Sequence, residues 1–265
     1  MNILYFGDIV GEPGRIALER LLPDMKKKYS ADIVLANVEN SAHGFGITPQ
    51  TMEEIYNAGV DFATSGNHAW KNTKGVELLR DEPETIAVPC NVIGMPGRKF
   101  LFTTVNGVRV LIINVLGQAF MHTEYGIESP YQSVNTILQE QSADVIIVDF
   151  HAEATGEKRA MSFYLDGRAS LLVGTHTHVQ TADEKIENKG LGYISDLGYC
   201  GATDSSLGMD ARLVVKKVAY EEEIHLEPPQ QYDTVHIQGI FARIDDATFR
   251  TTFIERIDQR FRIVV

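Results

Sequence analysis

Cysteine, tryptophan and basic residues are scarce in this chain of 265 residues. Its two cysteines, Cys90 and Cys200, lie far apart and form no CxxC pair, which argues against a disulfide framework and fits a reducing cytoplasm. Its apolar runs stay shorter than the roughly 18 consecutive residues that a membrane helix needs. The N-terminus opens directly into a strand-like run, without the basic and long apolar segments of a signal peptide. We therefore expect a cytoplasmic protein with no membrane span.

Positive charge is also in deficit, since the formal net charge is −12. A protein that tracks along a long nucleic acid needs a basic surface to neutralise phosphates, so that class of partner is disfavoured. A small phosphorylated substrate stays compatible with the charge, because bound divalent cations can dominate the local field. The acidic balance predicts a small substrate, or a short oligonucleotide at most.

Strand-like and helix-like segments alternate along most of the chain. Leu18, Leu22 and Met25 repeat at helical spacing, and Thr48-Pro49 is typical of the start of a second helix. We expect two further helices, over 131–141 and between Gly156 and Leu165.

The character of the sequence changes from about Gly190 onward. A strand is predicted over 191–196, followed by a Gly-rich loop to Gly208. The segments 236–244 and 250–257 alternate apolar and polar residues, as antiparallel strands with one buried face do. The pattern predicts one domain over 1–265, with a mixed sheet first and an antiparallel completion last.

Five short β-branched or Gly-containing apolar runs each end in potential metal ligands. In chain order these residues are Asp8, Glu39-Asn40, Asn67-His68, His151, and His176 with His178. Ligands of open α/β sheets gather at the carboxyl ends of the strands, so we expect these side chains to share one site.

The residue types in this set are those of a metal centre. His176 and His178, at i and i+2 of an extended segment, would project to the same side. With His151 they supply three imidazoles, which suit zinc, iron or manganese. Carboxylates such as Asp8 and Glu39 can hold a hard cation or bridge two. Two cations about 3.5–4 Å apart can clamp a phosphoryl group and activate a bridging hydroxide for in-line attack.

Each residue also has a plainer interpretation. Asp8 could cap a helix, Glu39-Asn40 could form a solvated turn, Asn67 could occupy a left-handed turn, and His151 could be a satisfied core histidine. Those interpretations would have to hold together at successive strand ends, which makes the metal site the better explanation.

The other histidines and one loop are weaker candidates. His43 and His122 lie in predicted loops, where each could contact substrate, whereas His225 and His236 fit surface or sheet positions. The loop 120–125 could shape the mouth of the pocket. No G-x-S-x-G elbow or G-x-x-x-x-G-K-[ST] phosphate loop competes with the metal site.

Taken together, the motifs closely resemble those of the calcineurin-like metallophosphoesterases, and within them the bacterial YmdB-like branch. The motifs are Gly7-Asp8, Glu39-Asn40, Gly66-Asn67-His68, His151-Ala152-Glu153-Ala154-Thr155, Gly174-Thr175-His176-Thr177-His178, Thr181-Ala182-Asp183-Glu184 and Asp204-Ser205-Ser206-Leu207-Gly208. The resemblance covers nearly the whole chain.

This resemblance implies a four-layer α/β/β/α sandwich of two mixed sheets with a binuclear site. It implies that Asp8, Glu39, Asn40 and His178 hold the first metal, and that Glu39 bridges to a second metal. The second metal would be completed by Asn67, His151 and His176, and His68 would serve the leaving group as the catalytic residue. It also implies phosphodiesterase activity with cyclic nucleotides as candidate substrates, iron or manganese with magnesium or zinc as alternatives, and a homo-oligomer, often a dimer or tetramer.

Two departures from the wider pattern bear on these expectations. The broad superfamily opens with Asp-x-His, whereas Asp8-Ile9-Val10 has no histidine; the YmdB-like branch shares this loss, and Asn40 would take that coordination. Lys71 stands where an acidic residue is expected, so no nearby carboxylate in the sequence would orient His68. Trp70 is better explained by packing than by substrate stacking.

Two other functions fit the same ligands. A phosphomonoesterase would use the same metals and would need a closed pocket with a cationic contact. A regulatory protein would bind a nucleotide at the metal site, with turnover incidental.

Overall fold

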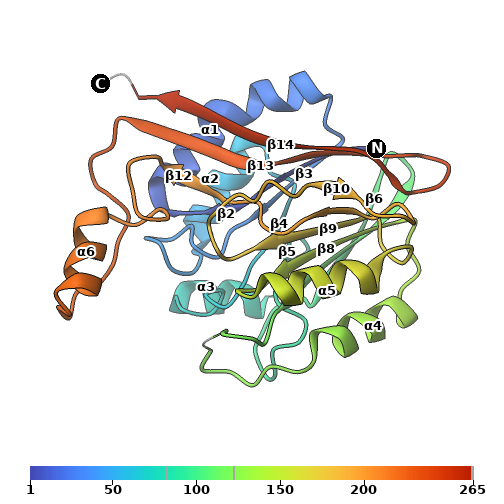
Figure 1. Ribbon diagram of the computed structural model, residues 1–265, viewed down its shortest axis with the longest axis horizontal. Helices are drawn as coiled ribbons and strands as arrows, with labels where there is room; N and C mark the ends of the chain where they lie inside the picture. The colour runs from blue at the N-terminus through green and yellow to red at the C-terminus, as the bar shows by residue number, and fades with distance from the viewer. Residues whose placement is uncertain (82, 122, 264–265) are drawn as a thin grey trace.

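Two sheets packed face to face form the centre of the computed structural model, which describes residues 1–81, 83–121 and 123–263 (Figure 1). Sheet one runs in the order β2-β12-β13-β1-β3-β4-β5, and β14 pairs with β13. Its strands are β1 (Asn2–Phe6), β2 (Asp8–Ile9), β3 (Ile33–Asn37), β4 (Phe62–Thr64), β5 (Ile86–Ala87), β12 (Tyr199–Ala202), β13 (Thr234–Ile244) and β14 (Thr251–Arg262).

Sheet two runs in the order β10-β11-β9-β8-β7-β6. Its strands are β6 (Phe100–Val105), β7 (Val108–Leu116), β8 (Val145–His151), β9 (Leu171–Thr175), β10 (Lys185–Ile186) and β11 (Gly192–Ile194). Both sheets are mixed: β1, β3, β4 and β5 pair in parallel, as do β7, β8, β9 and β11, while β13 and β6 run antiparallel to their neighbours. The parallel strands of each sheet therefore end at one edge.

Five helices cover the outer faces of the sheets: α1 (Gly11–Tyr29), α2 (Pro49–Ala58), α3 (Thr73–Arg80), α4 (Pro130–Glu140) and α5 (Thr155–Leu165). A further described helix is α6 (Ala211–Ala219). The predicted start of α2 is confirmed, since the Thr48 side chain accepts a hydrogen bond from the backbone N–H of Thr51 and Pro49 occupies the first turn. Helix α6 stands apart from the sandwich in Figure 1. Among the described helices, none has the length and apolar character needed to cross a membrane.

Strand alternation divides the buried side chains into three apolar layers. Leu4 and Phe6 of β1 face the helices α1 to α3, whereas Ile3 and Tyr5 face sheet two. On the far side, Val148 of β8 packs with residues of α4 and α5. Three separate cores between four layers are what an α/β/β/α sandwich requires, so the predicted fold is confirmed.

Several elements differ from the sequence expectations. The strand predicted over 191–196 is shorter, and the Gly-rich stretch after it contains β12, which pairs with both β2 and β13. The hairpin of β6 and β7 and the helices α3 and α6 had no counterpart in the prediction. Gly201 lies within β12, and Gly residues in strands weaken the sequence signal because they add no side-chain pattern.

Candidate metal centre

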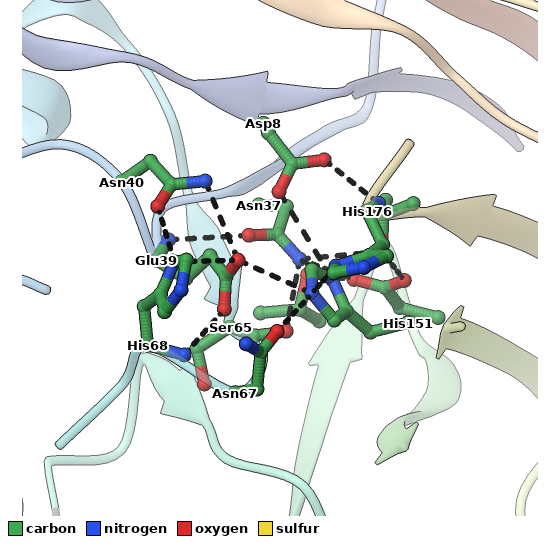
Figure 2. A network of polar contacts seen from close by, with 12 residues as sticks. Asp8, Asn37, Glu39, Asn40, Ser65, Asn67, His68, His151 and His176 are labelled. Atoms are coloured by element: carbon green, nitrogen blue, oxygen red, sulfur yellow. Dashed lines mark hydrogen bonds and ion pairs between the residues drawn. The ribbon is translucent and has the colours of Figure 1, made fainter. Parts of the chain in front are cut away.

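All seven predicted ligand residues come together at the edge where the parallel strands of both sheets end. Figure 2 labels all of them except His178. Asp8, Glu39-Asn40 and Asn67 follow or end strands of sheet one, whereas His151, His176 and His178 come from sheet two. The site therefore forms across the gap between the sheets. Glu39, His151 and His176 each place one ligand atom within 4.8 Å of the others.

One group of three residues, which we call the His151 half, consists of Asn67, His151 and His176. His151 Nε2 lies 3.0 Å from Asn67 Oδ1 and 3.0 Å from His176 Nδ1. His151 is fully buried. Burial and the neighbouring His151 lower the pKa of His176 to about 3, so its ring is neutral and can offer a lone pair.

A second group, the Asp8 half, consists of Asp8, Asn40 and His178. His178 Nε2 lies 3.6 Å from Asp8 Oδ1 and 3.2 Å from Asn40 Nδ2. Burial would lower the pKa of His178, but the Asp8 carboxylate raises it to about 9. Asn40 presents its amide nitrogen, not its oxygen, to His178. To coordinate a metal beside His178 through its oxygen, the Asn40 amide would have to flip, and the two amide orientations differ in their hydrogen-bond partners.

Glu39 lies between the two halves. Its Oε1 is 3.2 Å from His151 Nε2 and accepts a hydrogen bond of 3.3 Å from Asn40 Nδ2, one contact on each side. Burial would raise the pKa of this carboxyl, but His151 and His68 lower it well below its usual range. Glu39 is therefore a buried anion placed to serve both halves.

The outer nitrogen of every histidine in the cluster meets an acceptor. His151 Nδ1 lies 2.9 Å from Thr175 Oγ1, His176 Nε2 lies 3.2 Å from a Glu153 oxygen, and His178 Nδ1 lies 2.8 Å from the Leu207 carbonyl. A nitrogen that donates outward leaves the other nitrogen to face a cation, which would displace any proton held there, and metal-binding histidines have such partners. The three rings thus fit a metal centre.

An unpaired oxygen and a glycine add to this fit. Within the described ranges, Asp8 Oδ1 is a buried oxygen that has no hydrogen-bond partner, and such an atom calls for a cation or another donor. A Cβ at Gly66 would overlap Glu39 Oε2 and His151 Nε2. Only a residue without a side chain lets the ligand atoms approach this closely.

The plainer interpretations of Asp8, Glu39-Asn40 and Asn67 do not hold, whereas the buried and fully partnered His151 ring is compatible with either interpretation. No side-chain cap is present on α1, and the Asp8 oxygen Oδ2 instead accepts the backbone N–H of His176 at 3.2 Å. Glu39 and Asn40 are buried, which rules out a solvated turn. Asn67 does not have the positive φ of a left-handed turn.

The prediction that His176 and His178 lie on an extended segment is wrong, although both side chains reach the site. Strand β9 ends at Thr175, and the two histidines follow with φ values of 98° and 59° instead of extended geometry. This left-handed turn is held by the buried ion pair of Lys158 and Asp196, 2.8 Å apart. Lys158 donates to the Thr175 carbonyl, and Asp196 accepts the Thr177 N–H. A turn, not strand alternation, directs the two rings.

His68 lies at the rim of the cluster, with 24% of its side chain exposed. Its Nδ1 is 2.8 Å from Asn40 Oδ1 and 3.4 Å from Glu39 Oε1. The carboxylate that orients it is thus Glu39, from another strand end, and an acidic residue in place of Lys71 is not needed for that purpose.

The remaining candidates lie around this centre. A pocket of about 250 Å³ is lined by Asn67, Lys71, Thr123, Glu124 and Tyr125, so part of the predicted loop 120–125 borders the site. Trp70 is buried and its indole N–H donates to the Pro96 carbonyl, which confirms its packing role.

The other histidines fall elsewhere. His43 lines a different pocket, of about 440 Å³, with Arg15 and Lys74. His236 is buried in β13 and His225 is exposed, as their predicted sheet and surface positions allow. His122 lies outside the described residues.

Sequence reasoning missed the groups that support the ligands. These are Asp149, Thr175, Glu153 and the Leu207 carbonyl. One signal was available: Asp149 interrupts the apolar run from Val145 to Phe150, and a charge in a buried strand must have partners. A backbone carbonyl such as that of Leu207 has no sequence signal at all.

Comparison with known proteins places this arrangement in a family. The model of the YmdB-like protein family matches residues 4–257. The chain is 36% identical to a 2′,3′-cyclic-nucleotide 2′-phosphodiesterase of Bacillus subtilis over 97% of this chain and 96% of that protein.

Solved structures agree. A phosphatase from Mycoplasma pneumoniae matches with a TM-score of 0.92 at 29% identity, covering 98% of this chain and 93% of that one. A 5′-nucleotidase precursor from Thermus thermophilus, 13% identical with a TM-score of 0.56 over 97% of this chain and 54% of that one, shares the fold alone. The chain belongs to the YmdB-like family.

Proposed function

We propose that this protein is a binuclear metal-dependent phosphodiesterase that hydrolyses small phosphodiesters, with cyclic nucleotides of the 2′,3′- or 3′,5′-cyclic AMP type as its substrates. The observation that carries the proposal is the position of Glu39. One of its oxygens contacts His151 of one half and Asn40 of the other. A single buried carboxylate between two sets of nitrogen and oxygen ligands is the arrangement that a pair of cations needs.

The ligand roles follow from the two halves. Asp8, Asn40 and His178 would hold one metal, Asn67, His151 and His176 the other, and Glu39 both. Iron or manganese is expected, with magnesium or zinc as alternatives, because mixed imidazole and oxygen donors suit all of them. When bound, the cations would supply an acidified water as the nucleophile and charge neutralisation for the phosphoryl group.

His68 would assist departure of the leaving group. Its Nδ1 is held by Asn40 and Glu39, which leaves Nε2 as the ring nitrogen available to a substrate at the exposed rim. A ring held in this way can donate a proton to a leaving oxygen.

The substrate class is supported by relatives and by charge. The Bacillus subtilis relative is a cyclic-nucleotide phosphodiesterase, and a net charge of −12 disfavours long nucleic acids. Phosphomonoester hydrolysis is the second candidate, favoured by the similarity to the Mycoplasma pneumoniae phosphatase and by Lys71 in the pocket that contains Asn67. We expect one domain over 1–265 acting in a homo-oligomer, a dimer or tetramer.

The test is hydrolysis by metal-stripped protein with manganese or iron added back. The substrates are 2′,3′-cyclic AMP, 3′,5′-cyclic AMP and a phosphomonoester such as AMP. His178→Ala is the loss-of-site variant, and His43→Ala, which removes a histidine that lines a different pocket, is the matched control.

Metal-dependent cleavage of a cyclic nucleotide by the wild type and His43→Ala, lost in His178→Ala, would support the proposal and rank the two ester geometries. Cleavage of AMP alone would establish the monoesterase instead. Nucleotide binding without turnover at full metal occupancy would favour the regulatory function.

A further inference from the structure

Asp149 is a fully buried carboxylate beneath the candidate metal centre. It lies in β8 two residues before His151, so both side chains point to the same side of sheet two, into the gap between the sheets. Burial raises its pKa to about 6. Isolated charges are costly in such a position, so its partners deserve an explanation.

Three donors from three other strands converge on this carboxylate. Thr64 Oγ1 of β4 lies 2.5 Å from Oδ2, Asn37 Nδ2 of β3 lies 3.0 Å from Oδ2, and Thr175 Oγ1 of β9 lies 2.6 Å from Oδ1. These strands lead directly to ligands: Asn37 to Glu39, Thr64 to Asn67, and Thr175 to His176. Asp149 therefore ties together the strand ends that carry Glu39 and the His151 half.

The direction of the hydrogen bonds fixes the state of His151. An ionised carboxylate only accepts, so the Thr175 hydroxyl must donate to Asp149. The same hydroxyl oxygen then accepts from His151 Nδ1 at 2.9 Å. With the outer proton fixed on Nδ1, Nε2 is the nitrogen that faces the oxygens Asn67 Oδ1 and Glu39 Oε1, at 3.0 and 3.2 Å. Without a metal Nε2 donates to these acceptors, and a bound cation would take the place of that proton.

We propose that Asp149 is a positioning residue for the metal centre, which acts through Thr175 to hold His151 with its proton on Nδ1 and its Nε2 directed at the cation. The inference rests on the proposed metal site but not on the substrate or the reaction. If Asp149 only stabilised the fold, loss of any of its hydrogen-bond donors would weaken metal binding to the same extent.

Two matched substitutions separate these roles. Thr175→Val and Thr64→Val each replace a buried hydroxyl that donates to Asp149, but only Thr175 also contacts His151. Metal affinity, measured by calorimetric titration of the metal-stripped proteins with manganese and with zinc, should fall about 10- to 100-fold in Thr175→Val. Thr64→Val should stay within a fewfold of wild type, and Thr175→Ser, which keeps the hydroxyl, should restore tight binding. Asp149→Asn should resemble Thr175→Val, because an amide can donate to Thr175 and reverse the hydroxyl.

A direct measurement does not depend on the variants. Nitrogen-15 spectra of the zinc-loaded wild type, labelled on histidine, should show His151 with a proton on Nδ1 and zinc on Nε2. If Asp149→Asn fails to fold, this spectrum and the pair of threonine variants still decide.

Equal loss of metal affinity in Thr175→Val and Thr64→Val would overturn the proposal, as would a His151 proton on Nε2. A wild type that binds no metal would contradict the proposed function itself. Metal binding with no hydrolysis of cyclic nucleotides would leave the role of Asp149 intact.

Discussion

The two halves of the candidate centre differ in what holds them. In the His151 half, His151 lies 3.0 Å from each of its two partners and rests on the buried group of Thr175 and Asp149. In the Asp8 half, the contacts are 3.2 and 3.6 Å, Asp8 Oδ1 has no hydrogen-bond partner, and His178 is supported by the carbonyl of Leu207. Leu207 belongs to a surface segment and its side chain is 48% exposed.

This difference indicates that one half is preorganised by the core and the other is completed by a loop. Rigid supporting groups lower the cost of binding, because less order must be imposed when the cation arrives. We therefore expect two unequal metal affinities, with tighter binding in the His151 half.

The largest effect on both halves is expected when the negative charge of Glu39, which lies between them, is removed. Glu39→Gln should lose metal from both and reduce hydrolysis about 10³-fold or more, because a buried anion that offsets two cations is replaced by a neutral amide. Metal content by mass spectrometry and kcat would measure this. Glu54→Gln, which changes a glutamate on α2 paired with Arg15, is the control. Two metals retained in Glu39→Gln would contradict the central position of this residue.

Single histidine substitutions should show whether each half binds its own metal. We expect His178→Ala to keep about one metal per chain, in the His151 half, and to lose about 10²- to 10³-fold in kcat. His176→Ala should instead lose the more tightly held metal, since it contacts His151 Nε2. Metal stoichiometry after dialysis distinguishes the two variants. The same residual metal content and affinity in both would show that the halves are not distinct.

Substitution of His68 tests whether protonation of the leaving group can be lost while both halves keep their metals. His68→Ala should keep two metals and lower kcat about 10²-fold on a cyclic nucleotide, whose alkoxide leaving group needs a proton. The loss should be smaller on a p-nitrophenyl phosphodiester, because nitrophenolate leaves without one. An equal loss on both substrates would argue against proton donation by His68.

The smallest expected effect concerns stability. At free metal about 100 times its dissociation constant, a bound cation adds about 2.7 kcal/mol to the free energy of unfolding. Chelation should therefore lower Tm by about 5–10 °C and proceed in two steps, with the Asp8 half emptied first. His178→Ala should show a single step, and one unresolved step in the wild type would contradict unequal halves.

The sequence was sufficient to predict where the candidate ligands lie, but not which turns and strand pairings hold them there. Apolar runs ending in Asp8, Glu39, Asn67 and His151 predicted that these side chains meet, and they do, because parallel strands end at a common edge. The left-handed turn at His176 could not be predicted, since it is held by the distant pair Lys158 and Asp196. Likewise, the short strand β12 takes its conformation from pairing with β13, more than 30 residues later, and no local pattern encodes that partner.

The place of β1 within sheet one has a consequence for synthesis of the chain. The first strand lies between β3 and β13, and Asn2 pairs with Arg243. During translation, one edge of β1 stays unpaired until its partner strand β13 has been synthesised, more than 200 residues later. An apolar strand edge left open during synthesis invites pairing with other chains. Folding of this protein on the ribosome is thus expected to need protection until almost the whole chain has emerged.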